Sequence, residues 1–186
     1  ESQIKWVEST EEEAQRMRAL VDKMLELAKS EDMKEKLILG ELDISELTER
    51  VCLQFEPVAF EKGVEIESNI TEGIKMQTNE DAFVRLIHIL VDNAIKYGES
   101  GKKAKITLSQ TKQTVRLSVK NDGNIISDED LPHIFERFYR ADKARSVGGH
   151  GLGLSIAKNL TESLGGKITA ESSVQNGTVF TVVFKI

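Results

Sequence analysis

The sequence predicts an α+β domain: a two-layer sandwich in which three main helices cover one face of a mixed sheet of about five strands, preceded by a long helix. From residue 43 onward, segments whose apolar residues recur every three or four positions alternate with segments whose apolar residues recur every second position. The latter often occur in neighbouring pairs joined by short polar turns, as in antiparallel strands. A sheet of this kind buries one face under helices.

The first segment is expected to form a long amphipathic helix that ends near Ser30. A stripe of apolar residues along one face needs a bundle or a coiled partner to cover it. Residues 30–43 are polar and irregular and are expected to be a linker. We therefore divide the chain into residues 1–40, a helix with its linker, and residues 41–186, a globular domain. The apolar stripe comprises Met17, Leu20, Val21, Met24, Leu25 and Ala28.

Polar caps and apolar periodicity define the expected elements in the first half of the globular domain. Pro57 should kink the first helix or end its first part, because proline lacks a backbone N–H. In order, we expect a helix capped by Asp43 or Ser45, strands over 64–70 and 74–77, a helix from Thr78 or Asn79 to about Tyr97, and a hairpin of strands over 104–111 and 115–120.

The second half of the domain contains a long polar segment. Residues 139–150 are basic and end in glycines without any periodicity, which is typical of a mobile loop. In order, we expect a loop over 121–127, a short helix over 128–138, this mobile loop, a helix over 151–164, and strands over 166–173 and 178–185 around a turn at Asn176-Gly177.

The composition is that of a folded protein without a general affinity for nucleic acids. Hydrophobic residues make up 39% of the 186 residues, and the net charge is −6, whereas nucleic-acid binding needs a clustered basic face. Cys52 is the only cysteine, which excludes an intramolecular disulfide and a cysteine-rich metal cluster. Apolar runs are far shorter than a membrane span. Because the first residue is Glu1, we expect a fragment whose membrane-bound parts lie upstream.

Residues 90–97 place polar side chains on one face of the expected third helix. Asn93 and Lys96 lie three residues apart, so they are neighbours on the helix surface. An asparagine oxygen can join a Mg²⁺ shell beside phosphate oxygens, and a lysine one turn further on can reach a phosphate. Taken alone, this segment is more typical of a solvated helix edge.

Two further segments combine glycines with polar residues. At the end of a strand, Asn121 can accept a hydrogen bond from an adenine amino group, and Gly123 lets the backbone approach the ring, although an ordinary turn explains these residues better when they are taken alone. In residues 148–158, a glycine-rich loop enters a helix directly, which exposes backbone N–H groups to an anion. The alternative for this loop is a flexible hinge, and its spacing matches neither a P-loop nor a dinucleotide fingerprint.

Together and in this order, the three segments resemble the N box and the two glycine boxes of the ATP-binding domain of sensor histidine kinases, in the GHKL superfamily. Residues 132–140 (PHIFERFYR) resemble the F box of the same kinases, and residues 17–30 resemble the end of their second dimerisation helix. The resemblance covers nearly the whole chain. It implies a Bergerat-type fold and the function of the ATP-binding catalytic module of a two-component sensor histidine kinase, a protein-histidine kinase.

The resemblance also implies a role for each matching position. Asn93 would ligate Mg²⁺, Asn121 would read the adenine amino group, and Arg140 would approach the phosphates. Phe135 and Phe138 would anchor the mobile loop to the core. The implied ligands are ATP and Mg²⁺, and the residues expected at the nucleotide are Asn93, Lys96, Tyr97, Asn121, Gly123, Tyr139, Arg140, Gly149, His150, Gly151, Leu152, Gly153 and Leu154.

Three positions depart from the family pattern. Asn121 replaces the usual aspartate, and its uncharged oxygen accepts a weaker bond. Ile125 replaces a glycine, and Ile89 replaces a residue that is commonly asparagine. In the related gyrase and mismatch-repair ATPases, the position of Ile89 holds a glutamate that activates water. Isoleucine cannot act as a general base, so we expect very slow ATP hydrolysis and transfer to a protein acceptor instead.

None of the three histidines, His88, His133 and His150, precedes the pattern of a phospho-accepting histidine, and His88 is expected to be a packed residue with its hydrogen bonds satisfied. We therefore expect the acceptor upstream of Glu1, on the dimerisation domain of a homodimeric sensor anchored in a bacterial inner membrane, with this domain in the cytoplasm. The phosphoryl group would then pass to an aspartate of a response-regulator receiver domain. Two alternatives stay open: an anti-sigma serine kinase of the same superfamily, and a degenerate module that acts by docking without catalysis.

Overall fold

The computed structural model describes residues 14, 17, 18, 21, 25, 37–141 and 150–186. The described residues of the first segment are helical. The rest of the expected long helix and residues 30–36 of the expected linker lie outside the described residues. Met17, Val21 and Leu25, which belong to the expected apolar stripe, are each more than half exposed in this single chain. The division at residue 40 stays a prediction.

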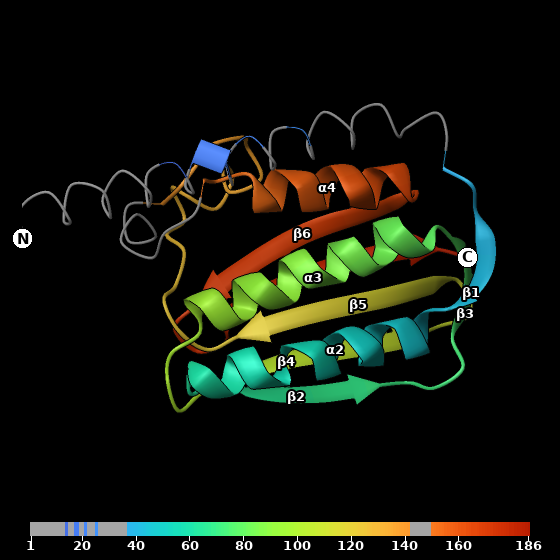
Figure 1. The fold of residues 1–186 in the computed structure, drawn as a ribbon, viewed down its shortest axis with the longest axis horizontal. Helices are drawn as coiled ribbons and strands as arrows, with labels where there is room; N and C mark the ends of the chain where they lie inside the picture. The colour runs from blue at the N-terminus through green and yellow to red at the C-terminus, as the bar shows by residue number, and fades with distance from the viewer. Residues whose placement is uncertain (1–13, 15–16, 19–20, 22–24, 26–36, 142–149) are drawn as a thin grey trace, which may run out of the picture.

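Five strands form a mixed sheet in the order β2-β4-β5-β7-β6 (Figure 1). Within this sheet only β2 and β4 run parallel, and the other neighbours are antiparallel. Apolar residues alternate along β4, β5 and β7 and are buried on one face of the sheet. The strands are β2 (Glu65–Ile70), β4 (Lys103–Gln110), β5 (Thr114–Asn121), β6 (Gly166–Ser173) and β7 (Gly177–Lys185).

Three helices lie on the buried face of this sheet (Figure 1), so the predicted two-layer α+β sandwich is confirmed. They are α2 (Ile44–Glu61), which packs on β2, α3 (Glu80–Tyr97), which packs on β4 and β5, and α4 (Gly153–Ser163), which packs on β6. Phe83, Phe180 and Phe184 are almost fully buried between the layers, and the rings of Phe83 and Phe184 lie 6.1 Å apart. Each such side chain contributes about 1.5–3 kcal/mol through burial.

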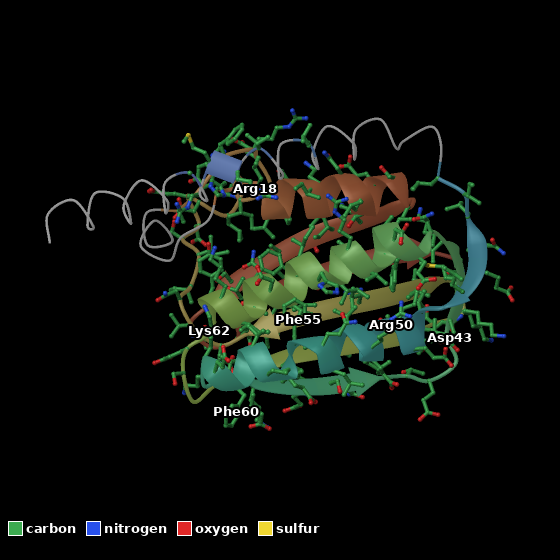
Figure 2. All side chains as sticks on the ribbon, in the orientation of Figure 1. Arg18, Asp43, Arg50, Phe55, Phe60 and Lys62 are labelled. Atoms are coloured by element: carbon green, nitrogen blue, oxygen red, sulfur yellow. The ribbon has the colours of Figure 1, made fainter. Side chains whose placement is uncertain are left out.

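Side-chain caps determine where α2 and α3 begin. Asp43 accepts hydrogen bonds from the backbone N–H groups of Ser45 and Glu46, and Asn79 caps α3 in the same way. Figure 2 shows Asp43 and Lys62 at the two ends of α2. The helix continues past Pro57 to Glu61, so this proline does not end its first part; the kink expected as the alternative stays a prediction. Pro57 is exposed, and water can therefore satisfy the carbonyl that its ring leaves unbonded.

A separate two-stranded sheet joins β1 (Gly40–Asp43) to β3 (Lys75–Thr78) in antiparallel register, with Leu42 opposite Met76. Residues 40–43 were expected to belong to the irregular linker, and the structure corrects this. Four residues are too few to show a clear alternation. The strand forms because a distant segment pairs with its backbone.

Residues 128–138 form successive turns, and the helix expected here is absent. The N–H groups of Asp130, His133 and Glu136 each donate to the carbonyl oxygen three residues earlier, at 3.1, 2.9 and 2.8 Å. Pro132 has no N–H to extend a helical pattern of bonds to the fourth residue back. These turns bring Ile134 into the core, where it is 7% exposed.

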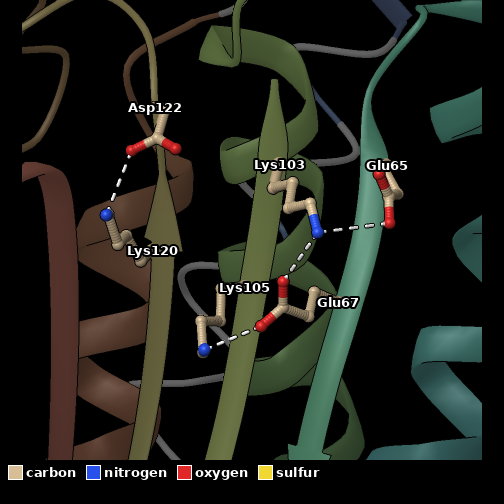
Figure 3. Close-up of polar contacts among 6 residues, drawn as sticks. All are labelled: Glu65, Glu67, Lys103, Lys105, Lys120 and Asp122. Atoms are coloured by element: carbon tan, nitrogen blue, oxygen red, sulfur yellow. Dashed lines mark hydrogen bonds and ion pairs between the residues drawn. The ribbon is translucent and has the colours of Figure 1, made fainter. Parts of the chain in front are cut away.

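Ion pairs tie together the parallel strands β2 and β4 (Figure 3). The carboxylate of Glu67 lies between Lys103 and Lys105, with N–O distances of 3.0 and 2.7 Å. Hydrogen bonds from Lys105 and then Lys103 lower the pKa of Glu67 to about 2. Because these side chains are exposed, the pairs help to set the register and contribute little to stability.

Candidate functional site

A cavity of about 180 Å³ opens where α3 ends and α4 begins. The last residue of β5, Asn121, and a residue near the start of β7, Thr178, lie opposite each other in the sheet and both line it. β5 ends on the left in Figure 1, at the same end of the domain at which α4 begins. All the residues expected at the nucleotide line this cavity except Gly123 and Gly149. Gly149 lies outside the described residues, together with the rest of residues 142–149.

α3 presents Asn93, Lys96 and Tyr97 to the cavity from its C-terminal end. They share one helix face because they lie three and four residues apart. The Nζ of Lys96 is 5.4 Å from the centre of the Tyr97 ring, within the range of a cation–π contact. Burial raises the pKa of the Tyr97 hydroxyl, and the positive charge of Arg140 opposes this shift. Arg140 therefore brings a second cation to this wall of the cavity.

Asn121 is a buried polar residue in the cavity wall, with 1% of its surface exposed. Its Nδ2 donates to the carbonyl oxygen of Tyr97 at 3.4 Å, which is a long and weak bond. In this orientation the Oδ1 atom is left to accept a hydrogen bond from a ligand. A neutral acceptor of this kind suits a ring that carries an amino group.

Gly123 does not line the cavity but joins the end of β5 to the end of α3. It forms an isolated bridge with Gly98, and a Cβ at this position would collide with the backbone oxygen of Tyr97. The N–H of Glu99 also donates to the carbonyl of Asp122 at 3.0 Å. A glycine is required here because the two backbones touch. A direct contact between Gly123 and a nucleotide stays a prediction.

The start of α4 supplies backbone donors to the same cavity. Leu152 precedes the helix and makes no side-chain cap, and the first turn contains no acidic residue. The first N–H groups of a helix have no partners within the helix, and the helix dipole adds partial positive charge. With Gly153 and Leu154 in the cavity wall, this arrangement favours an anion.

Gly151 holds the chain before α4 against residues 138–139. Its φ is +69°, and a Cβ at this position would lie 2.7 Å from both the carbonyl carbon of Phe138 and the carbonyl oxygen of Tyr139. The N–H of Phe138 donates to the carbonyl of Gly151 at 3.0 Å. Only glycine accepts both the left-handed backbone and the close approach.

Of the two phenylalanines expected to anchor residues 139–150, only Phe135 packs against the core. Its ring lies 6.3 Å from that of Phe180 in an edge-to-face arrangement. Phe138 is 53% exposed, so the expectation for its side chain is wrong. The turns of residues 128–138 account for the difference, because they direct Ile134 and Phe135 inward.

The donor set fits Mg²⁺ only in combination with a ligand that brings its own oxygens. Asp92 and Asn93 line the cavity, and the described residues contain no cluster of three acidic, histidine or cysteine side chains that could hold a metal. Mg²⁺ commonly takes one or two protein oxygens and completes its shell with phosphates and water. Ile89 also lines the cavity and offers no ligand atom. The side chain of Ile89 instead lies beside Gly153 at the start of α4, with its Cγ2 atom 3.6 Å from the position that a Cβ on Gly153 would occupy.

His88 has the packed role expected for it. Its Nε2 lies 3.1 Å from the Oε1 of Gln54, and its ring meets that of Phe55 edge-on at 5.1 Å. Burial lowers the pKa of its imidazole, which favours the neutral form. This partly buried side chain is therefore packed between α2 and α3, as predicted, with a hydrogen-bond partner at Nε2.

Several cavity residues carry no signal in the sequence. Thr178 is 3% exposed, and its hydroxyl shares a hydrogen bond of 2.8 Å with that of Ser172. It reaches the cavity because it pairs with Asn121 across two strands. Only the strand pairing reveals this contact. The other lining residues not expected in advance are Asp92, Asn124, Ile126, Ile134, Ala141 and Phe180.

Residues 78–186 match the family model described as "Histidine kinase-, DNA gyrase B-, and HSP90-like ATPase". The chain belongs to this family. Among curated relatives, the sensor histidine kinase YkoH of Bacillus subtilis (strain 168) is 35% identical over 180 residues, which cover 96% of this chain and 38% of YkoH. The chain spans only part of its curated relatives: 54% of the sensor histidine kinase YcbM of the same organism and 38% of YkoH.

Known structures of histidine kinases share this fold. The crystal structure of full-length ShkA in complex with AMPPNP matches with a TM-score of 0.80 at 27% identity, over 91% of this chain and 35% of that chain. Histidine kinase ThkA, in complex with the response regulator protein TrrA, matches with a TM-score of 0.75 at 28% identity, over 93% of this chain and 48% of that chain. None of the helices in the part of the chain that the structure describes combines the length and the hydrophobicity of a membrane-spanning segment.

Proposed function

We propose that the chain binds Mg-ATP in this cavity and acts as the catalytic module of a sensor histidine kinase. One observation carries the proposal: a single cavity combines a buried neutral acceptor, Asn121, with two cations, Lys96 and Arg140, and with the uncapped start of α4. An adenine nucleotide has the complementary groups, an amino-substituted ring and a chain of phosphates. Family membership and the AMPPNP complex of ShkA support this choice of ligand.

In the proposed reaction the residues of this chain hold and position the nucleotide. Asn121 accepts a hydrogen bond from the adenine amino group, and Lys96 and Arg140 offset the charge of the phosphates. The first N–H groups of α4 bind phosphate oxygens. Asn93 would hold Mg²⁺, which would supply further charge neutralisation when bound. The bond between the γ-phosphorus and its bridging oxygen breaks, ADP leaves, and a histidine nitrogen of the dimerisation domain takes the phosphoryl group. Such catalysis consists of positioning and charge stabilisation.

Water is a poor acceptor in this site. Ile89 faces the cavity from α3 and cannot remove a proton from water. The described lining residues include one carboxylate, Asp92, which is exposed. We therefore propose slow hydrolysis in the absence of a protein acceptor.

The partners belong to the same proposal. The chain would act on the dimerisation domain of its own homodimer, and the phosphoryl group would pass on to a response-regulator receiver domain. The complex of ThkA with the response regulator TrrA supports this relay. We also propose that the parent protein is anchored in a bacterial inner membrane, with this module on the cytoplasmic side; the relatives named as sensor histidine kinases support its role as a sensor.

Labelled ATP tests the reaction class. The chain is incubated with γ-³²P-ATP and Mg²⁺, alone and with the separately produced dimerisation domain of a similar kinase. A gyrase-type ATPase domain is run in parallel for phosphate release. We expect acid-labile label on the added domain, none on this chain, and phosphate release far slower than that of the gyrase-type domain. Rapid phosphate release without an acceptor, or label on the chain itself, would contradict the proposal.

A further inference from the structure

Asp130 ties together both ends of the turns that lead into the cavity. Its Oδ1 accepts a hydrogen bond of 2.6 Å from the hydroxyl of Tyr139, and its Oδ2 accepts one of 2.7 Å from the hydroxyl of Ser127. The N–H of Asp130 in turn donates to the Oγ of Ser127 at 3.1 Å. One carboxylate therefore connects the residue that begins the turns with the residue that follows them.

The contact with Tyr139 has the geometry of a strong hydrogen bond. A distance of 2.6 Å is typical of a hydroxyl that donates to an ionised carboxylate. This bond, followed by that of Ser127, lowers the pKa of Asp130, so the carboxylate is charged at neutral pH. The ring of Tyr139 also lies against that of His133, with centres 5.4 Å apart. The tyrosine is thus held both at its hydroxyl and at its ring.

The backbone beside Tyr139 has an unusual conformation that needs such support. Phe138 has a φ of +63°, although it is not a glycine. On one side its N–H is bonded to the carbonyl of Gly151. On the other side the next residue, Tyr139, is held by Asp130. Arg140 follows directly and lines the cavity.

We propose that Asp130 is a positioning residue for phosphate binding, which acts by holding the Tyr139 hydroxyl and thereby fixes the backbone from which Arg140 enters the cavity. The inference rests on the proposed function, because it takes the ligand to be a nucleotide whose phosphates meet Arg140. Asp130 itself is not among the residues that line the cavity. Its effect on the ligand therefore passes through Tyr139 and Arg140.

The substitution Tyr139→Phe removes only the hydroxyl and keeps the ring. Calorimetric titrations compare AMPPNP, which carries phosphates, with adenosine, which has none. We expect Tyr139→Phe to weaken AMPPNP binding by about five- to tenfold, the effect of losing one part-buried hydrogen bond, and to weaken adenosine binding clearly less, because adenosine has no phosphates to meet Arg140. Asp130→Asn should lose less AMPPNP affinity than Asp130→Ala, because the asparagine oxygen can still accept a hydrogen bond from the Tyr139 hydroxyl. Thr114→Val, which removes a hydroxyl from the remote hairpin turn, serves as the control.

A double substitution separates positioning from a general structural role. In an Arg140→Ala background, Tyr139→Phe should cause no further loss of AMPPNP affinity, because the residue it positions is gone. Equal losses of affinity for adenosine and for AMPPNP, or losses of AMPPNP affinity that multiply in the double variant, would overturn the inference about Asp130. Neither result would contradict the proposal that the cavity binds a nucleotide. If the wild-type chain binds no AMPPNP, the proposed function fails as well. Thermal unfolding of each variant shows whether the fold is retained.

Discussion

The substitution Gly151→Ala tests whether the start of α4 and the backbone of residues 138–139 are held in close contact. The new Cβ would lie 2.7 Å from two backbone atoms, and alanine would have to keep a φ of +69°. The left-handed conformation costs about 1–2 kcal/mol for a non-glycine residue. If the backbone moves away, the bond from Phe138 to Gly151 is lost, at about 0.5–1.5 kcal/mol. The free energy of unfolding should therefore fall by about 2–3 kcal/mol.

Thermal unfolding followed by circular dichroism measures this loss. For a chain of this size, the expected change corresponds to a midpoint lowered by about 4–12 °C. Gly153→Ala is the matched control for stability, because its Cβ would make only an ordinary contact, 3.6 Å from Ile89. Its position in the first turn of α4 also accepts alanine without strain. If the two variants unfold at the same temperature, the close contact assigned to Gly151 is refuted.

Three further substitutions or treatments have defined outcomes. Asn121→Asp replaces a neutral hydrogen-bond acceptor by a charged one, so calorimetry should show tighter AMPPNP binding. The variant should also prefer AMPPNP more strongly over an inosine analogue, whose ring carries an oxygen in place of the amino group. An unchanged preference for AMPPNP would contradict the contact between residue 121 and the adenine amino group. Burial raises the pKa of Cys52 to about 11, so the thiol is neutral at pH 8 and should react with iodoacetamide far more slowly in the folded than in the denatured chain. The pKa of Glu67 falls from its ordinary 4.5 to about 2 on folding, so its contribution to stability is present above pH 4.5 and is lost as the pH falls toward 2. Because the ion pairs with Lys103 and Lys105 are exposed and contribute little, denaturant unfolding across this range should show wild type losing only slightly more stability than Glu67→Gln; a large difference would contradict this assignment.

The main helices and strands were predictable because local signals define them. Asp43 and Asn79 cap their helices by bonds to residues two or three positions away, and the strands β4 and β5 alternate over eight residues each. The strand β1 was not predictable, because four residues carry little pattern and its partner β3 lies more than thirty residues away. The turns of residues 128–138 were mistaken for a helix, since apolar residues inside successive turns have a spacing similar to that of a helix.

The candidate site was predictable where its residues are neighbours in the sequence. Asn93, Lys96 and Tyr97 follow one another on a helix face, and the glycines before α4 mark a helix start open to anions. Thr178 was missed because it reaches Asn121 only through the pairing of β5 with β7. The bond between Asp130 and Tyr139 was missed for a similar reason, since it depends on turns that the sequence does not reveal.

Calorimetric titration with AMPPNP, in the presence and absence of Mg²⁺, tests whether the cavity binds a nucleotide together with the metal. Asn93→Ala is the matched variant, because it removes the side-chain oxygen proposed to hold the metal and leaves the helix intact. We expect binding that Mg²⁺ strengthens and that Asn93→Ala weakens, with less difference between the two proteins when Mg²⁺ is absent. No binding by the wild-type chain at millimolar AMPPNP, with or without Mg²⁺, would show that the cavity is not a nucleotide site.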